Sequence, residues 1–379
     1  MDLLIDGNAL LNVTGNAAVY SIRKNSNFDS SFITVEGGKN ILKDSSKLMF
    51  KNLILKYLAS VITPLKTNLT NVYFTFDETS WRKFYVKKHF ERNPESVEFT
   101  YKGNRKMDET KRELYMFFDY FKDEVLPDIL EIPGIHNIRV KGSEGDDVIA
   151  VLAEHLHCPK VIWTVDSDLS QLVKPGNNFT IVMGPKNKEH MKKLVLPEGY
   201  DAPAKPMGLD DFTIDGFGIA SLAKYLVGER EYQSLVVEPN DFTLRKIIMG
   251  DMKSDNIPSI YVKILNERRY GITEKSIEKI FARLEKEFDR MRWLELIDSG
   301  DSVFIDKVIE LTEETIGAGK DKIPSMVERF KLNTRLIRLS LPMIPPEMIT
   351  MIKYKFSQLD LSKKFDYRQY LDYAYEKQD

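Results

Sequence analysis

The chain has 379 residues, of which 42% are hydrophobic and 30% charged, so it can bury the core of two domains or of one elaborated domain. Its single cysteine, Cys158, excludes an internal disulfide and a cysteine-based zinc site, and no apolar run is long enough to cross a membrane. The net charge is −2 and the N-terminus carries an acid where an export signal has a base, so we expect a cytoplasmic protein without a membrane partner.

Short β-branched or aromatic runs alternate with helix-like segments over the first half of the chain. The expected strands are 3–6, 71–77, 137–142, 160–166 and 179–184. The expected helices are 47–62, 109–125 and 145–157. This alternation predicts an α/β fold in which helices cover both faces of a mostly parallel central sheet.

The rest of the chain divides into three parts. Residues 185–240 begin with a basic, proline-containing stretch and are expected to form an insertion in a core that spans 1–240. Helical patterns dominate from 241 to 345, which predicts a second, helical region. Residues 346–379 are expected to form an amphipathic or partly ordered C-terminal tail.

Acidic residues gather where the predicted strands end, and the carboxyl ends of parallel strands meet at one edge of a sheet. Each acid has a structural explanation when it is taken alone. Asp6 before Gly7 suits a turn, and Ser143 with Asp146 suits a helix capping box. Capping does not predict that several strands end in acid on the same edge. The candidate metal ligands are Asp6, Asp77, Glu144, Asp146, Asp147, Asp166, Asp168, Asp251 and Asp255.

These carboxylates are accompanied by no histidine or cysteine, and oxygen-only ligand sets suit hard cations such as Mg²⁺. Asp166 and Asp168 lie one residue apart, and like charges about 4 Å apart repel by roughly 4 kcal/mol at an effective dielectric constant of about 20. A positive partner is therefore required, whether an Arg or Lys side chain, backbone N–H groups or a metal ion. Two divalent ions about 3.5–4 Å apart would stabilise the attacking and leaving oxygens of a phosphodiester.

Residues 80–113 form a basic segment, in which ten Lys or Arg stand against five Asp or Glu between 82 and 112. A charge run is most often a solvated face. Here the Lys and Arg residues alternate with aromatic residues. Such a surface can bind phosphates through its charges while nucleic-acid bases stack on its rings. Lys102 and Arg105 are three residues apart and could clamp one phosphate from one helical turn. The candidate nucleic-acid contacts in this segment are Arg82, Lys83, Lys87, Lys88, Lys102 and Arg105.

Six motifs in order resemble the flap endonuclease family of 5′ nucleases and are most similar to bacteriophage 5′–3′ exonucleases and a phage ribonuclease H. They are LLIDGNALL, FTFDETS, YKGNR, EGDDVIA, TVDSDLSQL and IMGDMKSDNIP, and the similarity covers residues 1–345. The resemblance implies a 5′-nuclease, PIN-like core, a helical arch at 80–113 and a helical duplex-binding region at 241–345. It also implies a Mg²⁺-dependent exonuclease or flap endonuclease that cuts branched or nicked duplexes near 5′ ends and removes RNA primers in phage DNA replication.

The same resemblance implies a role for each candidate residue. The first metal ion would lie among Asp6, Asp77, Glu144, Asp146 and Asp166. The second would be held, directly or through water, by Asp168, Asp251 and Asp255, with Asp147 nearby. Lys102 and Arg105 match arch bases that position the scissile phosphate, and Lys246 matches a basic residue of the phage members. Asp146 and Asp166 are the carboxylates whose loss is expected to abolish catalysis, and Mn²⁺ is expected to replace Mg²⁺ in vitro.

Two departures from the family pattern stand out. The family usually has Asp-x-x-Asp in its last motif, whereas three residues separate Asp251 from Asp255, so which of them binds metal stays open. After DNIP the family continues into a Gly-rich helical hairpin that grips the duplex backbone, often with a monovalent cation. Here the chain reads SIYVKILNERRYGITEKSIEKI, and the hairpin is expected to be displaced to 270–276, lengthened or differently used.

The family implies that the partners are DNA and RNA–DNA duplexes with 5′ ends or flaps, in the host cytoplasm if a phage encodes the chain. Phage members also imply a sliding clamp and a single-strand binding protein, for which the tail from 357 is a candidate docking element. Three alternatives stay open from the residues. They are a junction-binding protein of the same fold that has lost catalysis, an aspartate-nucleophile phosphatase suggested by Asp-Ser-Asp after a strand, and an RNA-specific nuclease with a smaller core.

Overall fold

The computed structural model describes most of the chain outside the expected insertion. The described residues are 1–24, 32–36, 39–66, 69–93, 98–105, 107–173, 180–183, 194–195, 213–214, 217–218, 239–265 and 268–375. Most of the insertion expected at 185–240 therefore lies outside them. Within the described residues, no helix is long and apolar enough to cross a bilayer.

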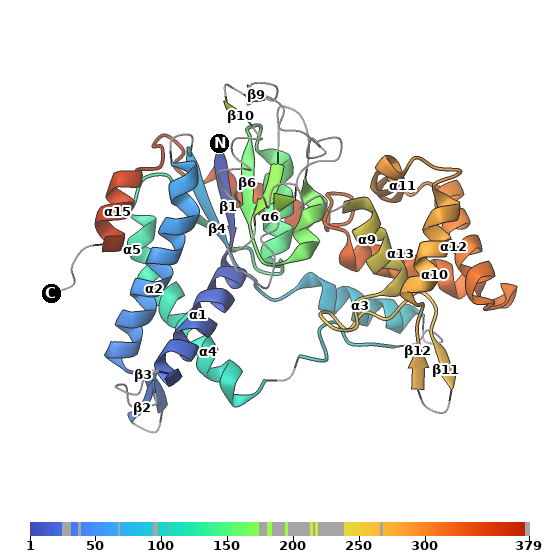
Figure 1. Cartoon of the computed structure of the whole chain (residues 1–379), viewed down its shortest axis with the longest axis horizontal. Coiled ribbons are helices and arrows are strands. Elements are labelled where there is room, and N and C mark those ends of the chain that lie inside the picture. The colour runs from blue at the N-terminus through green and yellow to red at the C-terminus, as the bar shows by residue number, and fades with distance from the viewer. Residues whose placement is uncertain are drawn as a thin grey trace.

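A six-stranded sheet in the order β5-β4-β1-β6-β7-β8 forms the centre of the first half (Figure 1). Its strands are β1 (Asp2–Asp6), β4 (Asn71–Thr75), β5 (Ile135–Ile138), β6 (Lys160–Trp163), β7 (Thr180–Met183) and β8 (Leu194–Val195). All neighbours pair in parallel except β8, which is antiparallel to β7. The predicted mostly parallel sheet is confirmed, although β5 begins two residues before the expected 137.

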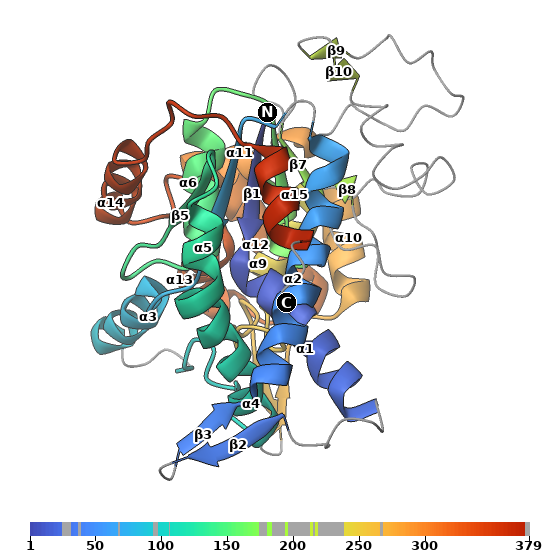
Figure 2. The same cartoon turned by 90° about the vertical axis from the view of Figure 1, so that its left-hand side faces the viewer.

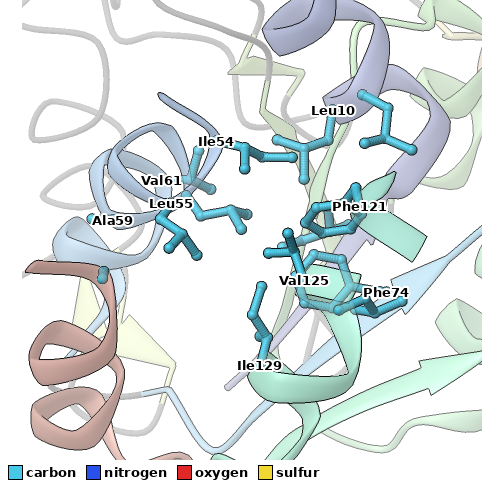
Figure 3. Packing of buried hydrophobic residues seen from close by; sticks show 14 of the residues in the cluster. Leu10, Ile54, Leu55, Ala59, Val61, Phe74, Phe121, Val125 and Ile129 are labelled. Atoms are coloured by element: carbon cyan, nitrogen blue, oxygen red, sulfur yellow. The ribbon is translucent and has the colours of Figure 1, made fainter. Parts of the chain in front are cut away.

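Helices cover both faces of this sheet, as Figures 1 and 2 show. One layer contains α1 (Gly7–Lys24), α2 (Asp44–Ile62), η1 (Thr63–Leu65), α4 (Glu109–Tyr120), η2 (Phe121–Val125), α5 (Leu126–Leu130) and α15 (Tyr367–Tyr375). The other contains α6 (Gly145–His155), η3 (Ser167–Leu172) and α14 (Pro346–Ser357). Alternate residues of β1 serve the two layers, because Leu3 and Ile5 join the first core and Leu4 joins the second. Figure 3 shows the first core, where Leu10 and Ile54 lie near Phe121.

Helix α1 was not among the expected helices, and it begins at Gly7, where the pair Asp6-Gly7 taken alone suited a turn. It begins directly after β1, and its buried side chains recur at helical spacing through Ile22. Two glycines obscure this pattern in the sequence, yet both serve close packing. A Cβ on Gly7 would lie 2.2 Å from the Phe76 ring, and one on Gly15 would lie 2.5 Å from Leu114. A hairpin of β2 (Ile33–Glu36) and β3 (Lys39–Leu42), also not expected, follows α1 along the chain.

The C-terminal tail returns to the first core. The Tyr370 hydroxyl donates to the Leu55 carbonyl at 2.8 Å, and the Phe365 N–H donates to Thr70 at 2.7 Å. Tyr370 is fully buried, and α15 lies against α2. The tail thus contains two helices, α14 and α15, joined by a non-helical stretch at 358–366, and α15 buries Tyr370 and Ala374 in the first core.

The second half forms a separate helical core. Its elements are α9 (Pro239–Met249), α10 (Glu274–Leu284), η4 (Arg290–Arg292), α11 (Trp293–Ser299), α12 (Ser302–Ile316), η5 (Lys320–Lys322) and α13 (Ile323–Ile337). Residues 270–276 contain the end of a strand hairpin, β11 (Lys263–Leu265) with β12 (Arg268–Tyr270), followed by Thr273, which caps α10. The described residues therefore place a β-hairpin where the family pattern led us to expect a helical one. A two-residue pair, β9 (Thr213–Ile214) with β10 (Phe217–Gly218), completes the strands.

The basic segment is anchored on this helical core. Helix α3 (Trp81–Arg92) buries Val86 and Phe90 there, and the following loop buries Phe99 and Tyr101. The Arg329 guanidinium of α13 lies 5.7 and 5.3 Å from the Phe90 and Phe99 ring centres. One side of α3 is therefore part of a packed interior, and only its other side can face a ligand.

Candidate functional site

Among the described residues, four acids at the carboxyl edge of the sheet lack a cationic partner. Asp6 ends β1, and its carboxylate accepts hydrogen bonds from the Ala9 N–H at 2.9 Å and the Thr164 hydroxyl at 2.7 Å. Burial, together with the charges of Asp77 and Asp166, raises the pKa of Asp6 to about 7, although the two hydrogen bonds oppose the shift. Asp6 is thus a buried acid whose charged form no described cationic side chain stabilises.

Asp77, Asp146 and Asp166 also lack a cationic partner among the described residues, although Asp77 and Asp166 are exposed to solvent. Asp77 accepts a hydrogen bond from the Gly145 N–H at 2.8 Å, and Asp166 accepts one from the Asp168 N–H at 2.8 Å. Burial raises the pKa of Asp146 well above its ordinary value, and Asp166, Asp6 and Asp77 add to the shift. Across the described residues, no Lys, Arg or His forms an ion pair with any of these four acids. A divalent cation would supply the missing charge through oxygen ligands.

Four other predicted acids are neutralised by the predicted bases. The Lys246 ammonium lies 2.6 Å from Asp168 and 2.7 Å from Asp251. Lys102 lies 2.5 Å from Glu144, and Arg105 lies 3.0 Å from Asp255.

These pairs set the charge of each acid differently. Burial raises the pKa of Asp168 to about 7 with help from Asp166, although Lys246 opposes the shift. Burial also disfavours ionised Glu144, but Arg82 and Lys102 lower the pKa of this side chain to about 2. Glu144 is therefore fully ionised at neutral pH.

Members of both groups of acids border one polar pocket with a volume of about 90 Å³, which is room for a few water molecules. Asp6, Asp77 and Asp251 are not part of its lining. Among the described residues, no three carboxylate, histidine or cysteine side chains converge closely enough to hold one ion together. The acids are therefore candidate ligands by charge and by position rather than by coordination geometry. The pocket is lined by Arg82, Tyr101, Lys102, Arg105, Glu144, Asp146, Asp166, Ser167, Asp168, Lys246, Ser254, Asp255, Leu336, Ile337 and Leu339.

Asp147 differs from the other predicted ligands because its carboxylate is already saturated. It is fully buried and accepts hydrogen bonds from Arg82, from the Trp81 indole at 3.0 Å and from the Glu144 N–H at 3.0 Å. The last bond caps α6, so the capping role expected for Ser143 and Asp146 falls one residue later. Asp146 is thereby free of that role, and we leave Asp147 out of the ligand set that we propose.

Arg82 was expected to contact nucleic acid, but only 1% of the residue is exposed. Its guanidinium points into the protein toward Asp147 and Glu144. A buried side chain with internal partners cannot reach a phosphate, so the expectation for Arg82 is wrong. Lys83, Lys87 and Lys88 do lie on the exposed side of α3.

Hydrogen bonds connect the loop 100–105 to the loop 251–256. They bring together the YKGNR motif and the IMGDMKSDNIP motif. The Asn104 amide donates to the carbonyls of Met252 at 2.8 Å and Lys253 at 3.0 Å. The Asn256 amide donates to Thr100 at 2.9 Å, and the Lys102 N–H donates to the Asp255 carbonyl at 2.8 Å. The phosphate-clamp bases and the last acidic pair therefore form one rigid unit.

Sequence reasoning missed several residues that shape this pocket. The Tyr101 hydroxyl lies 3.1 Å from Glu144 and 3.2 Å from Asp255, and Thr164 holds Asp6. Asn104 lies between Lys102 and Arg105 in the YKGNR motif, and this position was the only indication in the sequence that Asn104 could matter. Nothing in the sequence pattern of Thr164 distinguishes it from an ordinary strand residue.

Comparison with known proteins gives two kinds of match. Residues 32–200 match the family model of the 5′-3′ exonuclease N-terminal resolvase-like domain. A 5′-3′ exonuclease of Aquifex aeolicus is 28% identical over 219 residues, which are 55% of this chain and 61% of that protein. The chain thus spans about three fifths of the length of this curated relative.

Solved structures with a similar arrangement include the bacteriophage T5 D15 protein co-crystallised with metal ions. It has a TM-score of 0.48 at 14% identity, covering 94% of this chain and 98% of that one. A T5 flap endonuclease pseudo-enzyme–product complex with DNA and metal ions has a TM-score of 0.46 at 15% identity, with the same coverage.

Proposed function

We propose that this chain, which belongs to the 5′ nuclease family, is a divalent-metal-dependent nuclease that hydrolyses phosphodiesters near 5′ ends. The observation that carries the proposal is the set of four acids at the carboxyl edge of the sheet, which no described cationic side chain neutralises. An acidic pocket of this kind repels a phosphodiester unless cations occupy it. Mg²⁺ is the ion whose preference for oxygen ligands best fits these residues.

We assign the two groups of acids to two ions. Asp6, Asp77, Asp146 and Asp166 would hold the first, with Glu144 beside them. Asp168, Asp251 and Asp255 would hold the second, and Lys246 shares the charge of the first two of these. When bound, such ions supply a polarised water nucleophile and neutralise charge on the leaving 3′ oxygen.

Lys102, Arg105 and Lys246 would bind the scissile phosphate. In the structure each of these cations pairs with a carboxylate. When a metal ion neutralises that carboxylate, the cation can bind a phosphate group instead. Lys102 has a left-handed backbone with φ of 55°, which is costly for a residue with a side chain and is typical of functional positions. Lys83, Lys87 and Lys88 on the exposed side of α3 would contact the strand beyond the cleavage point.

We propose that the substrates are DNA and RNA–DNA duplexes with 5′ ends or flaps, including RNA primers, and that the helical region 241–345 binds the duplex. A sliding clamp or a single-strand binding protein would have to use a surface other than the apolar side of α15, because that side is buried in the first core.

The test is digestion of end-labelled 5′-flap, nicked-duplex and RNA–DNA hybrid substrates in Mg²⁺ and in EDTA. We expect cleavage in Mg²⁺ alone, with short released products that end in a 3′-hydroxyl and a new 5′-phosphate on the remaining strand. Binding of all three substrates without cleavage in Mg²⁺ or Mn²⁺ would instead support a junction-binding protein of the same fold.

A further inference from the structure

We infer that Arg82 is a positioning residue, which orients the Glu144 carboxylate from inside the protein. This inference rests on the proposed function, since it concerns the same acidic pocket. Arg82 begins the basic segment and would be taken for a nucleic-acid contact from sequence alone. Its burial instead places a fixed positive charge behind the pocket, where no substrate can reach it.

The guanidinium of Arg82 connects three parts of the fold. It forms a two-bond fork with Asp147, at 2.8 Å to Oδ1 and 3.0 Å to Oδ2, and it donates to Glu144 Oε2 at 3.2 Å. Its Nε donates to the Leu336 carbonyl, at the end of α13, at 2.9 Å. The start of α3, the first turn of α6 and the end of α13 are thus held by one side chain.

These bonds fix one oxygen of Glu144 and leave the other for the pocket. Oε2 accepts from Arg82 and from the Tyr101 hydroxyl at 3.1 Å, while Oε1 faces the Lys102 ammonium. Lys102 is partly exposed and can exchange Glu144 for a phosphate, whereas Arg82 cannot leave. Glu144 would therefore keep its orientation through the reaction, with Oε1 available to a cation.

The geometry requires arginine rather than any cation. Only a planar guanidinium can serve both oxygens of Asp147, one oxygen of Glu144 and a backbone carbonyl at once. Lysine at this position would keep the charge but could not make all four bonds. Trp81, which donates to Asp147 at 3.0 Å, would still hold that carboxylate in place. The substitution Arg82→Lys thus keeps the positive charge but removes the hydrogen bonds that orient the Glu144 carboxylate.

The experiment compares wild type, Arg82→Lys and a matched control, Arg338→Lys. Arg338 is also buried and forms a two-bond fork, to Asp298 at 3.0 and 2.8 Å, but it contacts none of the proposed ligands. Mn²⁺ binding is measured by calorimetry without substrate, and binding of a fluorescent 5′-flap DNA is measured in EDTA. Thermal melting reports how far each variant is folded.

We expect Arg82→Lys to weaken Mn²⁺ binding about 10-fold or more, the usual effect of losing a partner that orients a metal ligand. DNA affinity in EDTA should change less than 2-fold, and the control should melt lower with unchanged Mn²⁺ affinity. If Arg82→Lys fails to fold, Asp147→Asn should produce the same loss of Mn²⁺ affinity through Glu144.

Two results would overturn the inference. One is Mn²⁺ affinity equal to wild type in folded Arg82→Lys or Asp147→Asn. The other is a selective loss of DNA affinity, which would return Arg82 to a substrate-binding role. Failure of the proposed function itself looks different, because wild type would then bind no Mn²⁺ and cleave nothing.

Discussion

Asp146 lies in the first turn of α6, where no described Lys, Arg or His pairs with it, and its charge is opposed by Asp166, Asp6 and Asp77. We predict that Asp146→Asn lowers the cleavage rate by about 10³-fold or more, since the ion that neutralises this pocket would be lost or misplaced. Binding of flap DNA in EDTA should be retained. Single-turnover cleavage and fluorescence anisotropy measure the two effects.

The same substitution should raise the melting temperature of the metal-free protein, because it removes one of several repelling charges. Asp372→Asn, at an exposed position on α15, is the control and should change neither rate nor melting. Undiminished Mg²⁺-dependent cleavage by Asp146→Asn would remove this residue from the catalytic set.

Metal-free stability should depend on pH through the buried acids. Burial raises the pKa of both Asp6 and Asp168 to about 7, from an ordinary value of 3.8. The folded protein then takes up protons below pH 7 that the unfolded chain does not, so stability rises as pH falls from 8 to 6. The gain is about 1 kcal/mol for each such group. Glu144, with a pKa lowered to about 2, contributes the opposite dependence only below its ordinary value of 4.5.

Urea unfolding at pH 8, 7 and 6 measures this effect, first in EDTA and then in saturating Mg²⁺. Metal binding requires ionised carboxylates, so in Mg²⁺ the same fall in pH should reduce stability. A metal-free protein that loses stability between pH 8 and 6 would contradict the pKa shifts of Asp6 and Asp168.

At the scale of elements, the sequence was enough to predict the strands of the central sheet. It was not enough to predict helix α1, which packs against that sheet. Runs such as 71–77 and 160–166 are continuous and β-branched, as buried parallel strands require, and four of the five expected strands begin within one residue of those found. Helix α1 was missed because Gly7 and Gly15 suggest turns, although contact with Phe76 and Leu114 explains both. Such close approaches depend on segments distant in the chain.

Helix α15 gives a test of how the tail is held. Tyr370 is fully buried against α2, so Tyr370→Ala should lower the free energy of unfolding by about 3–5 kcal/mol. Tyr370→Phe, which keeps the ring but loses the bond to Leu55, should cost about 1 kcal/mol. Tyr354→Ala is the control, since Tyr354 is 62% exposed on α14. Equal stability of Tyr370→Ala and Tyr354→Ala would mean that the tail is not docked in solution.

At the scale of the whole molecule, the pocket lies where an α/β core meets a helical core. Acids from the first turn of α6 and from the segment after β6 line this pocket with bases from the loop after α3 and from α9. The sequence placed these acids on one edge, because parallel strands end together. It could not show that Arg82 is buried or that Lys246 joins Asp168 to Asp251, because those contacts depend on how the two cores dock.

The most direct measurement is a calorimetric titration of Mn²⁺ into the metal-free wild-type protein and into Asp146→Asn. Four neighbouring acids without a cationic partner should bind at least one ion in wild type, with release of protons near pH 7. Asp146→Asn should lose that binding while remaining folded. Absence of Mn²⁺ binding by folded wild type, or unchanged binding by Asp146→Asn, would contradict the account.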